Sequence, residues 1–124
     1  MQRLSATLGR TELAKSVPKD STPLPAGYHL AYFTPSEIEG DLGRDGTDRT
    51  FNAPHPFTRR MWAGGELEWL GGEHNMLKVG QEVQETTKLL TAVGKKTKAG
   101  EEMVVLGVEK SFSNEHGVAL IDRR

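Results

Sequence analysis

The fold is decided by the stretch Met103-Val104-Val105-Leu106-Gly107-Val108-Glu109-Lys110-Ser111-Phe112. Large apolar side chains recur at every second position, which places them on one face of an extended strand. That face carries Val104, Leu106, Val108 and Phe112. Ser113 to Gly117 is then typical of a hairpin turn, and Val118 to Ile121 begins another strand. The region therefore predicts an antiparallel hairpin with one apolar side.

Upstream of this hairpin the pattern continues. Val83 to Val93 predicts a strand, and the lysine-rich loop from Gly94 to Gly100 joins it to Met103. Met61 to Leu70 is a further candidate strand, interrupted by Gly64-Gly65, and glycines inside a strand indicate a bulge or a close backbone approach. Residues 61–124 therefore predict an antiparallel meander.

The first half of the chain is less regular. Residues 1–15 predict a short helix, with Leu4 and Leu8 on one side, and residues 16–60 predict an irregular connection rich in proline and glycine. Within it, Gly27 to Phe33 is expected to be extended. The fold class is thus α+β, with one unit over 1–124 in which an antiparallel sheet packs on a helix. Because so short a helix is too small to cover the sheet, we expect the fold to be incomplete at both ends.

Composition excludes several functions. The net charge of −1 leaves no electrostatic footprint for nucleic acid, and no apolar run approaches the roughly 20 residues of a membrane span. The chain has no cysteine, so disulfides and thiolate metal sites are excluded. Acidic Glu12 and Asp20 argue against reading the N-terminus as a transit peptide. We predict no metal site, because no two histidines have metal-ligand spacing, and no cofactor.

The histidines are the candidates for chemistry. His29, His74 and His116 are interpreted as packed or solvated, because none has a partner at a defined spacing. His55 follows Asp48, and also Asp45, in one loop. A carboxylate and an imidazole around one water could serve hydration or dehydration beside a thioester carbonyl. The alternative is a solvated proline-containing loop.

The most distinctive stretch is Arg59-Arg60-Met61-Trp62-Ala63-Gly64-Gly65. Paired arginines suit phosphate or carboxylate, and glycines let a backbone approach a ligand closely. Candidate substrate-binding residues are therefore Arg59, Arg60, Trp62, Gly64 and Gly65. The other reading is the beginning of a strand with an aromatic residue at a domain interface. The basic loop from Lys95 to Lys98 could meet an acidic carrier or could be a solvated hairpin tip.

The order of these segments resembles the type-2 hydroxyacyl-thioester dehydratase family, which includes mesaconyl-type coenzyme A hydratases of the MaoC-like hot-dog group. The resemblance rests on six stretches: 4–8, 24–33, Asp45-Gly46, the specific Arg59 to Gly65 run, and the turns at 77–80 and 95–100. It implies a hot-dog unit, in which an antiparallel sheet wraps a long helix. It also implies that the substrate is an acyl thioester of coenzyme A or of acyl carrier protein. The resemblance further implies a mitochondrial location; without it, we would expect a cytoplasmic location.

Members of this family carry two such units, and the C-terminal one usually holds the catalytic Asp and His. This chain resembles the N-terminal, non-catalytic half, which shapes the acyl pocket. Asp48 to His55 spans seven positions, more than in the family's active pattern, and Ala53 breaks its Asn-Pro pair. The partner would be a second hot-dog unit, either a C-terminal half or a second copy. Two alternatives stay open: a stand-alone homodimeric hydratase using Asp48 and His55, and a non-enzymatic interaction module.

Overall fold

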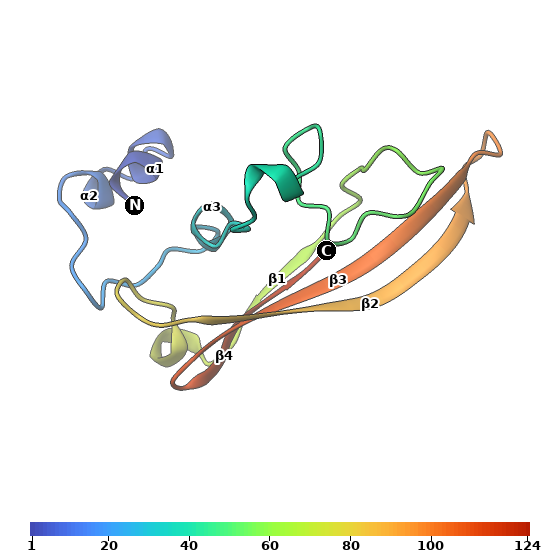
Figure 1. The fold of residues 1–124 in the computed structure, drawn as a ribbon. Coiled ribbons are helices and arrows are strands. Elements are labelled where there is room, and N and C mark those ends of the chain that lie inside the picture. The colour runs from blue at the N-terminus through green and yellow to red at the C-terminus, as the bar shows by residue number, and fades with distance from the viewer.

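The computed structural model describes all residues from Met1 to Arg124. Its elements are, in chain order, α1 (Gln2–Thr7), α2 (Thr11–Ala14), α3 (His29–Tyr32), η1 (Glu39–Asp41), β1 (Glu66–Trp69), η2 (Gly72–Asn75), β2 (Gln84–Lys96), β3 (Glu102–Asn114) and β4 (Gly117–Arg123). The four strands form one antiparallel sheet in the order β1-β4-β3-β2. Figure 1 shows this sheet as a long twisted layer, with the three α-helices and the connection after them on one side. The predicted α+β class with an antiparallel sheet is confirmed.

The strongest sequence pattern gives the longest element. β3 extends over 102–114, slightly beyond the predicted 103–112, and pairs with β2 along nearly its full length. The register shifts between Leu89 and Thr91, so that Leu90 is an additional residue in β2. Such a bulge bends and twists the strand locally.

Register and alternation define two faces of the sheet. We call the side of the sheet on which α3 packs the inner face. It carries four neighbouring side chains, from β1 (Trp69), β3 (Phe112) and β4 (Leu120 and Asp122). A small core lies here, made of Leu77, Phe112, Ala119 and Leu120, with Leu24, Phe33 and Val83 packed against it. A core of this size matches the low apolar content of the sequence.

The helix predicted over residues 1–15 is broken into α1 and α2. Gly9 lies between them at a φ of 69°, a left-handed conformation that interrupts helical hydrogen bonding. α1 is held by a hydrogen bond of 2.9 Å between the Ser5 and Tyr28 hydroxyls, both buried. The guanidinium of Arg10 lies 5.3 Å from the centre of the Tyr28 ring. The N-terminal helices therefore contact Tyr28 and its surroundings.

Two further segments differ from the prediction. Residues 27–33, expected to be extended, contain the single turn α3, whose end is closed by hydrogen bonds from the Tyr32 and Phe33 amides to Tyr28 and His29 carbonyls. This turn directs His29 and Phe33 toward Phe112. The strand expected over 61–70 is limited to Glu66–Trp69, because only these residues pair with β4.

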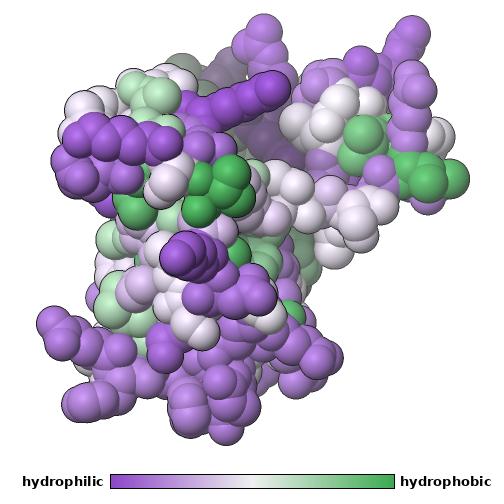
Figure 2. All heavy atoms as spheres, turned by 90° about the vertical axis from the view of Figure 1, so that its left-hand side faces the viewer, coloured by the Kyte–Doolittle hydropathy of each residue, from purple (hydrophilic) through white to green (hydrophobic).

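The outer face of the sheet is charged. The Arg123 guanidinium bridges three carboxylates, at 2.9 Å from Glu109, 3.1 Å from Glu68 and 3.8 Å from Glu66. Figure 2, which views the end of the molecule that carries the N-terminal helices, shows a largely hydrophilic surface with separate hydrophobic spots. None of the helices is long and apolar enough to cross a membrane.

Candidate functional site

A buried polar cluster lies where α3 meets β4. His29 and Asp122 are 3% and 2% exposed, and the His29 Nε2 atom is 3.8 Å from Asp122 Oδ2. Asp122 lies on β4 at a position that alternation directs to the inner face, next to Leu120. A buried carboxylate and imidazole are costly to desolvate unless they are paired, so this cluster is the first place to look for function.

Aromatic rings hold His29 in place. Its ring is 5.5 Å from that of Phe112 and 6.5 Å from that of Trp69, in edge-to-face arrangements. The Nε2 atom has no hydrogen-bond partner. The sequence prediction that His29 is packed is therefore confirmed, but its acidic neighbour was not expected.

Arg124 neutralises Asp122. Its Nε donates to both carboxylate oxygens, at 2.9 and 3.1 Å, and its Nη2 donates to Oδ2 at 2.5 Å. This forked geometry is the strong form of a carboxylate–guanidinium pair. The hydrogen bonds that Arg124 donates to Asp122 raise the pKa of Arg124, so the guanidinium stays charged.

The protonation of His29 follows from these neighbours. Burial lowers its pKa below the ordinary 6.5, and the positive charge of Arg124 lowers it as well, while Asp122 opposes both. The imidazole is thus neutral near pH 7. The adjoining cavity is only about 10 Å³ and is lined by Leu24, Pro25, His29, Trp69, Met76, Leu77 and Leu120. That is room for about one water and not for an acyl group.

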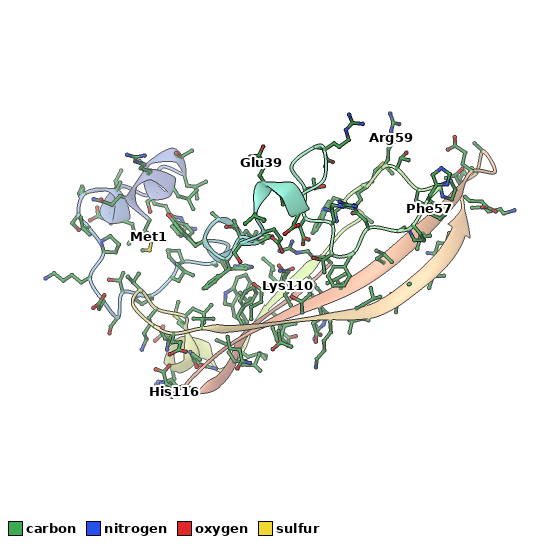
Figure 3. The ribbon with its side chains drawn as sticks, viewed as in Figure 1. Met1, Glu39, Phe57, Arg59, Lys110 and His116 are labelled. Atoms are coloured by element: carbon green, nitrogen blue, oxygen red, sulfur yellow. The ribbon has the colours of Figure 1, made fainter.

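The charges continue across the inner face as a row formed by Asp122, Lys110 and Glu85. Asp122 faces Lys110 in the register of β4 and β3, and the Lys110 ammonium forms an ion pair with Glu85 of β2. Figure 3 shows Lys110 between the strands and the connection above them. This charged row divides the apolar inner face into two parts.

The predicted pair Asp48 and His55 is not joined. Asp48 Oδ1 accepts hydrogen bonds from the Thr50 amide at 2.8 Å and the Thr50 hydroxyl at 2.5 Å, which lower the pKa of Asp48. Asp45 Oδ1 is bound to Thr47 in the same way. His55 is exposed, and no hydrogen bond or ion pair links it to either carboxylate. In this structure the loop is organised by its own turns.

The Arg59 to Gly65 stretch lies on the surface. Arg59 and Arg60 are exposed, and Trp62 is 72% exposed. Figure 3 shows Arg59 directed away from the sheet. The charge of Arg60 contributes to the lowered pKa of Asp45 and of Asp48, so it lies near this loop.

The two glycines of this stretch have different reasons: Gly64 has a positive φ, and Gly65 is closely packed. Gly64 has a φ of 149°. A Cβ atom on Gly65 would come within 2.7 Å of both the Arg123 carbonyl oxygen and the Trp62 ring. Gly65 therefore lets the chain and the Trp62 side chain pass close to the end of β4.

Sequence reasoning missed Asp122, Arg124 and Lys110. A signal was present for Asp122, because an acidic residue follows Leu120 at the next inward position of an apolar strand. No group of three or more His, Cys, Asp or Glu residues lies together in a way that could hold a metal ion.

Comparison with known proteins agrees with this fold. The family model for hydroxyacyl-thioester dehydratase type 2 matches residues 27–124. A mesaconyl-C(4)-CoA hydratase of Chloroflexus aurantiacus is 32% identical over 78 residues, which cover 61% of this chain and 26% of that protein. The match thus spans about a quarter of the relative's length. The chain belongs to the hydroxyacyl-thioester dehydratase type 2 family, within the MaoC-like hot-dog group.

Proposed function

We propose that this chain is the non-catalytic, N-terminal half of a (3R)-hydroxyacyl-thioester dehydratase or hydratase, and that it forms one wall of the acyl pocket. The observation that carries the proposal is the separation of Asp48 from His55. The Asp48 carboxylate is engaged by Thr50 and the imidazole of His55 is exposed, so no acid and base share a water there.

The surface supports the need for a second unit. Apolar side chains of β2 are about half exposed: Leu89 and Leu90 at 50% and Val93 at 48%. Two hollows on the chain, beside α2 and beside His29, measure about 260 and 10 Å³, which is below the usual size of a ligand pocket. A second hot-dog unit packed along β2 would cover side chains of this strand and enclose a larger space.

The substrate class comes from the family and from Arg59 and Arg60. An acyl thioester of coenzyme A or of acyl carrier protein carries phosphate, and exposed guanidinium groups suit phosphate. Trp62 and the close approach at Gly65 would then line the path toward the acyl chain. From the family resemblance alone we also propose a mitochondrial location.

A second candidate is a self-sufficient hydratase. One specific observation favours it: His29 and Asp122 are a buried imidazole–carboxylate pair with an unsatisfied Nε2 atom. Opening of the small cavity beside them would be required before a thioester could reach them.

An assay of crotonyl-coenzyme A hydration by the purified chain separates the two candidate functions. The reaction is monitored through the loss of enoyl absorbance. The proposal predicts no turnover above background. Turnover that is abolished by His55→Ala would show that Asp48 and His55 act as a catalytic pair, and it would contradict the proposal. Turnover that His29→Ala abolishes and His55→Ala leaves intact would establish the second candidate.

A further inference from the structure

The inner face continues past the small core as an apolar strip on β2 and β3. Residues that are directly opposite in the register share a face, so the strip can be followed from strand to strand. It consists of Val104, Leu106 and Val108 of β3 and, opposite them, Gly94, Ala92 and Leu89 of β2. None of these side chains is charged or can form a hydrogen bond, so the strip suits an apolar occupant.

The strip is open along β2. Leu89 is 50% exposed, and Ala92 and Gly94 are exposed as well, whereas the β3 residues of the strip are half-buried. A Cβ atom added to Gly94 would have no other atom within 4 Å. There is therefore free space above this part of the strip, in which a narrow ligand can lie.

Charged residues lie at both ends of the strip. At one end the Lys110 ammonium forms an ion pair with Glu85, and at the other end Lys96 is opposite Glu102. The strip covers about 13 Å along β3, because each residue of a strand advances about 3.3 Å. An extended hydrocarbon chain of roughly ten carbons has a similar length, since its C–C bonds are about 1.5 Å long. The strip thus matches an aliphatic chain of limited length.

Stability does not explain why Lys110 and Glu85 interrupt the inner face. β3 lies between β4 and β2, and the two side chains are only 20% and 32% exposed. Ion pairs that are removed from water contribute little to stability, and apolar replacements are often as stable. Beyond the hydrogen bonds from Thr50, the charge of Lys110 adds to the lowering of the Asp48 pKa, so the loop that carries Asp48 lies near this pair. The pair is thus a polar barrier between the strip and Phe112.

We propose that the strip holds the aliphatic chain of the acyl thioester and that Lys110 with Glu85 sets the limit to its length. The inference rests on the proposed function for the class of ligand. Figure 3 shows Phe57 and Arg59 toward the hairpin end of β2 and β3, away from Lys110. Phosphate groups bound by Arg59 would lie at that end, and the tail of the chain would stop at Lys110. A longer tail would take both charges out of water without replacing their hydrogen bonds, so medium-length chains are favoured.

The first test is the dependence of affinity on chain length. Isothermal titration calorimetry is carried out with butyryl-, hexanoyl-, octanoyl-, decanoyl-, dodecanoyl- and tetradecanoyl-coenzyme A, each below its micelle concentration. The affinity should rise by up to about fourfold for each methylene group that lies on the strip. The rise should stop once the chain reaches Lys110 and Glu85.

Removal of the barrier should move this limit. In the double variant Lys110→Leu/Glu85→Val the affinity should keep rising, so that tetradecanoyl-coenzyme A binds about tenfold or more tightly than to the unmodified chain. The matched control is Lys88→Leu/Glu109→Val, which removes the same two charges from opposite residues on the outer face and should keep the limit. Circular dichroism of each variant checks that the sheet is retained.

A charge placed in the middle of the strip should act on long chains alone. Ala92→Glu should weaken the binding of dodecanoyl-coenzyme A by about tenfold or more and leave that of butyryl-coenzyme A within about twofold, because only the longer chain covers this position. Val93→Glu is the matched control. It adds the same charge one residue away, on the outer face, and should leave both affinities unchanged.

An affinity that does not depend on chain length would overturn the inference and would leave the strip as a surface for the second hot-dog unit. The inference also fails if the limit persists in Lys110→Leu/Glu85→Val, or if Ala92→Glu and Val93→Glu weaken binding equally. The crotonyl-coenzyme A assay tests the proposed function separately. Turnover together with the expected length dependence refutes the proposed function alone, whereas no turnover together with length-independent affinity refutes this inference alone.

Discussion

Replacing His29 with phenylalanine should remove most of the pH dependence of stability between pH 7 and pH 5. His29 is 3% exposed and its pKa is lowered by burial, so the folded protein resists protonation of this ring. The unfolded chain takes up the proton near the ordinary pKa of 6.5. The stability contributed by the neutral buried ring is therefore complete above pH 6.5 and is lost as the pH falls below it.

The size of the effect has an upper limit set by one proton. Each pH unit below 6.5 lowers the free energy of unfolding by at most about 1.4 kcal/mol. The loss at pH 5 therefore reaches at most about 2 kcal/mol if His29 stays unprotonated in the folded state. Acidic groups contribute little in this window. The lowered pKa values of Asp45, Asp48 and Glu115 start from 3.8 to 4.5, so their stabilisation is lost at more acidic pH.

Urea unfolding at pH 7.5, 6 and 5, followed by tryptophan fluorescence, measures this directly. Phenylalanine keeps an aromatic ring against Trp69 and Phe112, so the variant should fold and show a nearly flat profile over this range. His116→Gln, at the exposed β3–β4 turn, is the control and should follow the unmodified protein. If the His29→Phe profile declines as steeply as that of the unmodified protein, the assignment of the buried proton site is wrong.

Three further predictions concern packing and charge. Phe112→Ala should lower the free energy of unfolding by about 3–5 kcal/mol in urea titration, because Phe112 is 1% exposed at the centre of a small core. Gly65→Ala should lower the free energy of unfolding by about 1–3 kcal/mol through overpacking, and it should lower the melting temperature. Gly40→Ala is the control: no atom lies within 4 Å of its new methyl group, so overpacking should not lower its melting temperature. Asp122→Asn removes the nearby negative charge, so the pKa of His29 should fall further, and NMR titration of the ring would contradict the geometry if the pKa rose or stayed the same.

The sequence alone determined the sheet and the family. The alternating apolar residues of 103–112 and the glycine-containing turns around them define β3 and its neighbours locally, because side-chain direction in a strand depends only on position along it. The Arg59 to Gly65 stretch indicates the family from sequence alone, since its residue order is specific.

The tertiary structure decided the rest. Residues 27–33 have no strong local preference, so their conformation follows from the packing of His29 and Phe33 on Phe112. Likewise, the sequence shows Asp122 only as an acidic residue within a strand. The fold brings α3 to β4 and so places His29 beside it. The burial, ion pairing and pKa of a side chain depend on residues that are distant in the chain, and no local sequence pattern shows which distant residues will become neighbours. Closeness in sequence is an equally poor guide, because Asp48 and His55 are only seven positions apart and are not joined by a hydrogen bond or ion pair.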